Sequence, residues 1–425
     1  MIGSTRREDV IPKCDEIQAW IGPVRRYTGA LAVAAMFIGA GAIVYADETD
    51  SRPVFTIGYV DLAEDVRYDD WGIHPTDIRS ATAIQDRRGY PGAVLGLSDI
   101  KRLERMAKAS FALEHARAAD ETAALAAIIR LHDEQGIDFF LLDLPDHAVA
   151  DIARATRGGG LVLINVSATG NALRNDDCQP HLIHIAPSRA MLIDGLTQFL
   201  VAKKWREVLV LQGPHAEDAE TVAALERSAA LFGLDLVEVR QFVLGSDPRA
   251  RDLNDLDFLT GGADYDVVFV ADVDGEFAHG VPYGTKLPVP VVGASGLVPR
   301  AWHWSHLRHG APQVHGRFER MHDRRMNEAD WGAWMGMKMV AEGVVRGRSL
   351  LTSDIEAYLN SGKARIDGSK GKVMGLRPWS NQLRQPILLT TPEWVVALAP
   401  VKGFRHRTND LDTLGYESRD TTCEF

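Results

Sequence analysis

A short polar stretch directly follows an apolar run and carries side chains suited to holding a small molecule. Residues 161–164 are apolar, and Ser167, Thr169 and Asn171 follow them within GGGLVLINVSATGNALR, residues 158–174. An apolar run that is bounded by glycines and too short for a helix predicts a strand buried on both faces. In an open α/β sheet, ligands bind just beyond the carboxyl ends of the strands. We therefore expect these hydroxyl and amide groups to lie at a ligand site. The alternative for Ser167 and Thr169 is that they only cap local backbone.

Two groups of residues that often bind metals are present, but neither has the spacing of a metal site. The carboxylates of an acidic loop suit a hard cation such as calcium, yet the loop lacks the spacing and central glycine of a calcium-binding loop. His303, His306 and His309 are three residues apart, but no cysteine or close carboxylate completes a zinc site. We predict no metal and no cofactor. The acidic residues of the loop are Asp61, Glu64, Asp65, Asp69 and Asp70.

The sequence lacks the short motifs of common enzyme classes. We find no nucleophile elbow (G-x-S-x-G), no dinucleotide loop (G-x-G-x-x-G) and no metalloprotease helix (H-E-x-x-H). An α/β hydrolase or dehydrogenase acting through Ser167 or His215 would rest on the fold class alone, and a fold class does not determine function. We predict that the chain is not an enzyme.

Strand-like and helix-like segments alternate through most of the chain. This alternation predicts parallel sheets with helices on both faces. Predicted strands cover residues 54–60, 110–117, 137–143, 161–166, 181–187, 207–213, 234–244, 265–272 and 289–296. Predicted helices cover residues 91–108, 120–136, 146–157, 188–205, 216–233 and 250–262. After residue 300 the pattern changes to helices at 327–347 and 352–362 and a closing hairpin at 384–391 and 394–400.

The N-terminal region predicts export. Residues 27–46 are apolar and uncharged, follow Arg25 and Arg26, and end in Val44-Tyr45-Ala46. A basic flank, an apolar run and a small-x-small exit indicate a signal peptide with a long polar N-region, residues 1–46, cleaved after Ala46. An uncleaved membrane anchor is the alternative, because about 20 apolar residues can span a bilayer.

Composition and cysteine content agree with an exported globular protein. Hydrophobic residues make up 46% and charged residues 25% of the 425-residue chain, which is long enough for two lobes. The net charge of -11 argues against a nucleic-acid partner. Cleavage would remove Cys14 and leave Cys178 and Cys423. We expect these two to form a disulfide that anchors the C-terminal tail, and two unrelated thiols are the alternative.

The order of elements resembles a type I periplasmic binding protein, more specifically the branched-chain amino-acid-binding family of ABC-transporter solute receptors. The resemblance covers residues 54–400. It implies a two-lobed α/β fold in which each lobe is a mainly parallel sheet flanked by helices, with a cleft between the lobes. The segments that carry it are SATGNALR (167–174), HLIHIAPSRAMLIDGLTQFLVAKKWREVLVL (181–211), WGAWMGMKMVAEGV (331–344) and NQLRQPILL (381–389). The implied organisation is lobe 1 at 53–186 plus 309–365, lobe 2 at 187–308 plus 366–400, and a tail at 401–425.

Several positions depart from the family pattern, so we expect a ligand other than a free α-amino acid. Asp146 and His147 stand where the family has a hydroxyl residue that binds the ligand's carboxylate, and an aspartate would repel a carboxylate. His215 replaces a tyrosine, and no acidic residue accompanies Ser295. The remaining candidate ligand residues are Ser167, Thr169, Asp272 and, for stacking or covering an apolar ligand, Tyr68 and Trp71.

Two further segments, LLDLP (141–145) and RPWSNQLRQPILL (377–389), resemble the substrate-binding component of pyrroloquinoline quinone (PQQ)-dependent alcohol dehydrogenase systems. This resemblance implies a periplasmic receptor that passes a small solute to an ABC permease. The alternative is a periplasmic accessory or sensor protein for the quinoprotein dehydrogenase, without transport.

Overall fold

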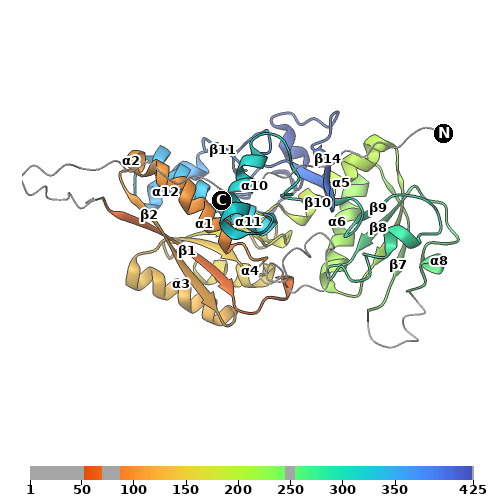
Figure 1. Cartoon of the computed structure of the whole chain (residues 1–425), viewed down its shortest axis with the longest axis horizontal. Helices are drawn as coiled ribbons and strands as arrows, with labels where there is room; N and C mark the ends of the chain where they lie inside the picture. The colour runs from red at the N-terminus through yellow and green to blue at the C-terminus, as the bar shows by residue number, and fades with distance from the viewer. Residues whose placement is uncertain (1–51, 69–86, 245–253, 424–425) are drawn as a thin grey trace, which may run out of the picture. The chain divides into compact units, whose positions relative to one another are not determined.

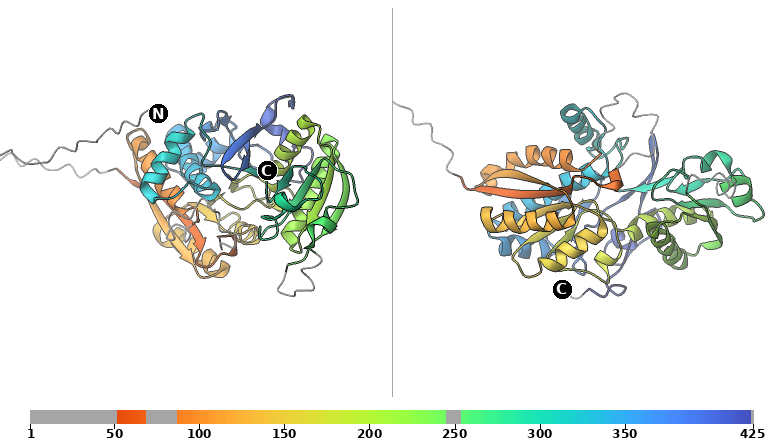
Figure 2. Two further views of the ribbon diagram at one scale, coloured as in Figure 1. Left: turned by 45° about the vertical axis from the view of Figure 1, so that its right-hand side comes forward. Right: turned by 90° about the horizontal axis from the view of Figure 1, so that it is seen from below.

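A computed structural model describes residues 52–68, 87–244 and 254–423 (Figure 1). Residues 52–425 form one compact unit. Two parallel sheets with flanking helices dominate this unit, and Figures 1 and 2 show the first in red to yellow and the second in green. The predicted α/β class with parallel, helix-covered sheets is confirmed.

The first sheet has the strand order β2-β1-β3-β4-β5, and all its neighbouring strands are parallel. Its strands are β1 (Val54–Leu62), β2 (Ser110–Ala118), β3 (Phe139–Asp143), β4 (Val162–Asn165) and β5 (Leu182–His184). The helices between them are α1 (Tyr90–Ile100), α2 (Glu104–Ala107), α3 (Glu121–Gln135) and α4 (Asp146–Ala155), with short 3₁₀ turns η1 (Val66–Tyr68), η3 (Lys101–Leu103) and η4 (Ala172–Arg174).

The second sheet has the order β7-β6-β8-β9 and is also parallel throughout. Its strands are β6 (Glu207–Gln212), β7 (Asp235–Gln241), β8 (Val267–Ala271) and β9 (Val291–Gly293). The accompanying helices are α5 (Arg189–Lys203), α6 (Ala216–Phe232), α8 (Leu256–Leu259) and α9 (Val281–Gly284). Ser188 caps α5 by accepting a hydrogen bond from the Met191 amide.

The later part of the chain adds helices and two small antiparallel sheets. The helices are α10 (Ala311–His322), α11 (Glu328–Gly347) and α12 (Thr352–Asn360), with a 3₁₀ turn η6 (Asp410–Thr413) near the end. The small sheets are β10 (Val298–Arg300) with β13 (Ile387–Thr391) and β14 (Trp394–Ala399), and β11 (Ile366–Asp367) with β12 (Val373–Met374). The predicted closing hairpin is therefore present, whereas α10, β10 and the β11–β12 pair were not predicted.

Strands β1, β3, β4 and β5 of the first sheet are buried on both faces, which explains their apolar residues, whereas the edge strand β2 is only partly buried. Along β1, Ile57 and Tyr59 face the core formed with α1, α10, α11 and α12, and Val60 and Leu62 face the core formed with α3 and α4. A third core joins α5 and α6 to the second sheet and to β13 and β14, and a fourth covers the sheet's other face.

The core contacts differ at one point from the predicted division of the chain. Met374, Leu376 and Leu383 belong to the core of the first sheet, although residues 366–400 were assigned to lobe 2. The reason is that the β11–β12 pair packs on α11, where Gly368 lies against Trp331. The lobe boundaries as a whole stay a prediction.

The predicted signal peptide lies outside the described residues. Within the described ranges, no helix has the length and apolar character needed to cross a bilayer.

Glycines allow α11 to approach its neighbours closely. A Cβ atom at Gly92 of α1 would lie 2.0 Å from the Asp330 carbonyl oxygen of α11. A Cβ at Gly332 of α11 would lie 2.2 Å from the Val166 carbonyl oxygen, just after β4. At both places backbone meets backbone with no side chain between.

We predict that Gly92→Ala destabilises the protein, because the new methyl group must push α1 away from α11. The expected loss is roughly 1–3 kcal/mol of unfolding free energy, as for other overpacked sites. Chemical denaturation would measure it. Gly347→Ala is the matched control, since its Cβ would lie 3.6 Å from the nearest atom outside its own helix turn. Equal stability of Gly92→Ala and Gly347→Ala would contradict this prediction.

Candidate functional site

A fully buried carboxylate organises the C-terminal edge of the first sheet. Asp143 ends β3 with no solvent exposure. It accepts hydrogen bonds from the Tyr59 hydroxyl at 2.8 Å, the Tyr68 hydroxyl at 2.5 Å and the Gly89 amide at 3.1 Å. Burial, reinforced by the charge of Asp143, raises the pKa of both tyrosines well above 10.0, so both remain donors at neutral pH.

Arg67 connects this carboxylate to the polar stretch after β4. Its guanidinium makes an ion pair with Asp65 at 2.6 Å, lies 3.5 Å from Asp143, and donates to the Ser167 hydroxyl at 3.0 Å. The structure thus brings together two predicted residues, Tyr68 and Ser167. Tyr68 acts here as a hydrogen-bond donor to Asp143.

The buried Asn165 at the end of β4 shapes the turn that presents Ser167. Its amide oxygen accepts hydrogen bonds from the Ser167 and Ala168 amides, and its amide nitrogen donates to the Ala168 carbonyl at 2.8 Å. We call residues 167–171, which contain the candidate ligand residues Ser167 and Thr169, the ligand loop. Asn165, and not the Ser167 hydroxyl, thus accepts the hydrogen bonds of the Ser167 and Ala168 amides.

Asp146 contacts the ligand loop instead of capping its own helix. Pro145 is the N-cap of α4, and the Asp146 carboxylate accepts the Gly170 amide at 2.9 Å. The Arg189 guanidinium lies 3.9 Å from Asp146 and also pairs with Glu220 of α6. The Thr169 carbonyl accepts the Arg189 amide at 2.8 Å. Arg189 therefore links the loop of the first sheet to a helix of the second.

His147 lies at the start of α4 and pairs with Glu121 at the start of α3. It is exposed and makes no described contact to the ligand loop, unlike its neighbour Asp146. The sequence prediction for His147 is untouched by this pairing and stays a prediction.

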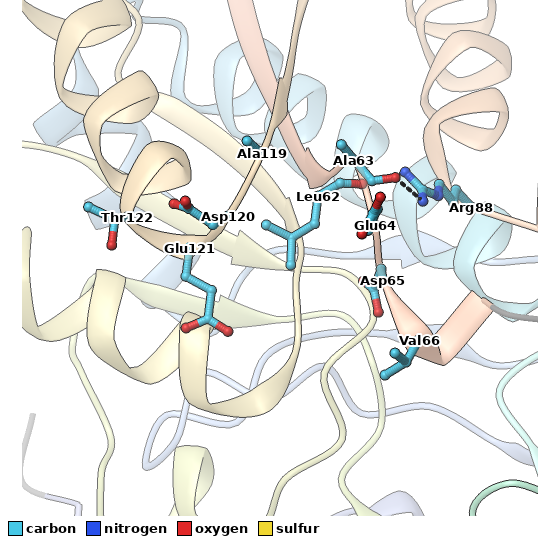
Figure 3. A pocket seen from close by; sticks show the side chains of 10 residues that line it. All are labelled: Leu62, Ala63, Glu64, Asp65, Val66, Arg88, Ala119, Asp120, Glu121 and Thr122. Atoms are coloured by element: carbon cyan, nitrogen blue, oxygen red, sulfur yellow. Dashed lines mark hydrogen bonds between the residues drawn. The ribbon is translucent and has the colours of Figure 1, made fainter.

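An open pocket of about 800 Å³ lies beside the Asp143 cluster, at the ends of β1 and β2 (Figure 3). Arg88 holds one side by donating to the Ala63 carbonyl at 2.7 Å, and Asp65 joins the pocket to Arg67. Figure 3 shows Asp120 and Glu121 of the α3 start across the pocket from Glu64. Four of the ten lining residues are acidic and one, Arg88, is basic.

The second sheet has a separate acidic group at its C-terminal edge. The His215 ring lies 2.8 Å from Asp274, and the buried Asp272 caps the Ala278 amide at 2.8 Å. Burial raises the pKa of Asp272, and the charges of two neighbouring aspartates, Asp218 and Asp274, add to the rise. Ser295 is half-buried in the turn after β9. Two of the predicted residues, His215 and Asp272, are thus on one edge.

Arg67 and Asp143 were not predicted from the sequence, and Trp71 lies outside the described residues. A signal for Asp143 existed, because it is the charged residue that closes the apolar run FFLLD. Arg67 offered no signal, since its partners Ser167 and Asp143 are 100 and 76 residues away.

The two potential metal groups do not assemble in the described part of the chain. No cluster of three or more suitable ligands occurs there. Asp61 pairs with His115 and Arg117 and Asp65 pairs with Arg67, while Asp69 and Asp70 are outside the described residues. His303 and His306 are buried and His309 is exposed, with no helix over this segment.

Cys178 and Cys423 form a disulfide with a Cα–Cα distance of 5.8 Å. The bond joins the turn that follows the ligand loop to the C-terminal tail, as expected from the sequence.

No family model matches the sequence, and no curated protein is similar to it. Solved structures are similar in fold. A periplasmic binding protein from Burkholderia mallei has a TM-score of 0.61 at 13% identity, covering 88% of this chain and 98% of that one. An ABC transporter substrate-binding protein from Desulfitobacterium hafniense in complex with Leu has a TM-score of 0.63 at 15% identity, covering 80% and 99%. A solute-binding protein of an ABC transporter from Rhodopseudomonas palustris BisB5 in complex with 3,4-dihydroxybenzoic acid has a TM-score of 0.60 at 12% identity, covering 80% and 93%. The chain has the fold of these proteins.

We predict that Asp143→Leu destabilises the protein by about 2–5 kcal/mol, because it leaves the buried Tyr59 hydroxyl and Gly89 amide without an acceptor. Adding Tyr59→Phe should recover part of this loss. Denaturant unfolding of the single and double variants measures the effect, with the exposed Asp151→Asn as control. Equal stability of Asp143→Leu and the unmodified protein would contradict the role given to Asp143.

We predict that acid destabilises the protein partly through His303 and His306. Burial lowers the pKa of each from 6.5 to about 4, helped by Arg300, Arg325 and His315 near His303 and by His309, Lys370 and Arg308 near His306. The unfolded chain therefore binds more protons between pH 6.5 and 4. The stability that comes from keeping these two histidines neutral is fully present above pH 6.5. It is lost as the pH falls toward 4.

Thermal unfolding at pH 7.5 and pH 5 would test this prediction. The double variant His303→Gln/His306→Gln should lose less stability on acidification than the unmodified protein. His279→Gln, at an exposed position outside this segment, should lose as much as the unmodified protein. Identical acid responses of all three proteins would contradict the prediction.

Proposed function

We propose that the chain is an exported solute receptor, the substrate-binding protein of an ABC-type transport system. The observation that carries this proposal is the fold shared over most of the chain with solute-binding proteins of such transporters. Candidate ligand residues lie at the C-terminal edges of both parallel sheets, where ligands of open α/β sheets bind. In this proposal the protein works by binding and carries out no catalysis.

Capture would follow from closure of two lobes around the ligand. A ligand that contacts both edges favours the closed state in proportion to its extra contacts there. The proposed contacts are Ser167, Thr169, Tyr68, Trp71, Asp146 and His147 from lobe 1 and His215, Asp272 and Ser295 from lobe 2. Arg189, between Asp146 and Glu220, is a charge that closure would rearrange.

The charge of the lobe 1 edge supports a small solute other than an α-amino acid. A ligand carboxylate needs free N–H donors, but the Asp146 carboxylate already occupies the Gly170 amide. The nearby arginines are already committed: Arg67 pairs with Asp65 and Asp143, and Arg189 pairs with Asp146 and Glu220. The N–H groups of the buried Arg174 are taken by carbonyl and amide oxygens. A neutral, hydroxylated or carbonyl-bearing solute would avoid the repulsion that a carboxylate meets here.

We further propose an association with PQQ-dependent alcohol oxidation, in which the solute derives from that chemistry. An ABC permease and the quinoprotein dehydrogenase system would be the partners, in the periplasm, after removal of residues 1–46. The alternative is an accessory or sensor protein for the dehydrogenase, without transport. Neighbouring genes for a permease and an ATPase would favour transport, and their absence would favour the accessory role.

We expect a panel of alcohol-derived aldehydes, acids and quinones to contain a compound that stabilises the mature protein against heat. At 100-fold excess over the dissociation constant, the stabilisation should be about 2.7 kcal/mol. Leucine and the acids of the panel are the carboxylate-bearing comparison, and the aldehydes and quinones should stabilise the protein more, because a carboxylate should be repelled. Differential scanning fluorimetry gives the readout.

The binding site can be checked with the compound that the screen identifies. Ser167→Ala and His215→Ala should each raise its dissociation constant, whereas Ser349→Ala, at a surface turn far along the chain, should leave it unchanged. A folded protein that responds to no compound of the panel would count against the receptor proposal. Turnover of a panel compound that disappears in Ser167→Ala would favour an enzyme instead.

A further inference from the structure

The Arg174 guanidinium is buried at the base of the ligand loop and is bound by neutral acceptors. It donates to the Gly170 carbonyl at 2.8 Å, the Ala168 carbonyl at 2.8 Å and the Ala186 carbonyl at 2.9 Å. Its Nε donates to the Gln382 side-chain oxygen at 2.9 Å. Two of these four acceptors belong to the ligand loop itself.

None of the described hydrogen bonds of Arg174 goes to a carboxylate, although the side chain is 2% exposed. Burial lowers its pKa to about 9, so it is still charged at neutral pH. A buried cation without a paired anion opposes folding unless its hydrogen bonds are all well made. The planar guanidinium of Arg174 instead fixes the directions of the several carbonyl groups to which it donates.

The C-terminal tail binds the backbone next to Arg174. The Thr421 hydroxyl donates to the Arg174 carbonyl at 3.2 Å. Thr422 makes two hydrogen bonds to Asn175, from its amide at 3.1 Å and from its hydroxyl at 2.6 Å. The disulfide from Cys423 to Cys178 follows directly.

The other end of this tail is buried in the third core, the one that joins α5 and α6 to the second sheet. Leu414 is fully buried there, and the Gly415 amide donates to Asp194 of α5 at 2.6 Å. The buried Asp412 pairs with Arg377 at 3.0 Å and Arg384 at 2.8 Å. Residues 411–423 thus run from a fixed anchor to the disulfide, and we call them the strap.

We propose that the strap and Arg174 together hold the ligand loop in its binding conformation, with Arg174 as a positioning residue and the Cys178–Cys423 bond as the fastening. Releasing Cys423 frees Thr421 and Thr422, which loosens the backbone that carries Arg174. The carbonyls of Ala168 and Gly170 then lose their fixed donor. The consequence for affinity rests on the proposed function, whereas the ordering of the loop does not.

Hydrogen–deuterium exchange of the whole mature chain tests the ordering without any ligand. In Cys423→Ser, and in the unmodified protein treated with a phosphine reductant, we expect residues 167–175 to exchange about tenfold faster, because local opening becomes easier. Strands β1 and β3 should be unchanged. Unaltered exchange of residues 167–175 in both samples would overturn the proposal.

Arg174→Met tests the role of the guanidinium separately from that of the Cys178–Cys423 disulfide. It should speed exchange of residues 167–171 even with the disulfide intact, whereas Arg154→Met, at an exposed position on α4, should not. If Arg174→Met fails to fold, the Cys423→Ser and reduction samples decide the question. Slow exchange in a folded Arg174→Met protein would remove Arg174 from the proposal.

A second measurement tests affinity with the compound that the thermal-shift screen identifies. Its dissociation constant should rise by about tenfold in Cys423→Ser, mainly through faster release, because a loosened loop must be reordered on binding. A failed compound search would count against the receptor function and leave the exchange result decisive for the strap. Faster exchange of residues 167–175 with an unchanged dissociation constant would overturn the proposed effect of the strap on binding.

Discussion

The candidate site depends first on keeping one carboxylate out of water. Asp143 lies where β1, β3, the η1 turn and the start of α1 meet, and its oxygens accept from residues of each neighbour. An ion in such a place is stable only while all its partners stay in position. The charge therefore fixes the backbone that follows β1, and through Arg67 it fixes the position of Ser167. A ligand bound at this edge, as proposed above, would meet groups that are already oriented.

The sheets could be predicted from the sequence because most of their strands are recognisable as short apolar runs. A parallel strand covered on both faces must be apolar throughout, so runs such as FFLLD and VVFVA are visible without any tertiary knowledge. The elements that were missed lack such a signature. β10, β11 and β12 have two or three residues each, and the Pro299 of β10 argues against a strand. They form because the chain around them is held by α11 and β13, which is a tertiary effect.

The site was only partly predictable, for a related reason. The position of Ser167 follows from the rule that ligands bind at strand ends, and Tyr68 follows β1 in the same way. What each side chain does there depends on partners distant in sequence. Tyr68 was expected to cover an apolar ligand, yet its hydroxyl is committed to Asp143. Asp146 was expected to face the ligand, yet its carboxylate accepts a hydrogen bond from the Gly170 amide. Hydrogen bonds of this kind have no local pattern.

The close contact between α11 and the end of β4 has a consequence for motion. Where Gly332 faces the Val166 carbonyl, no side-chain layer lies between helix and strand that could compress or slide. The ligand loop begins one residue later, so its first residue is held close to the 20-residue helix α11 and can move little relative to it. Any rearrangement of this edge must carry α11 along as a rigid body. The flexibility that a hinged molecule requires is then left to the peptide segments that cross between the sheets.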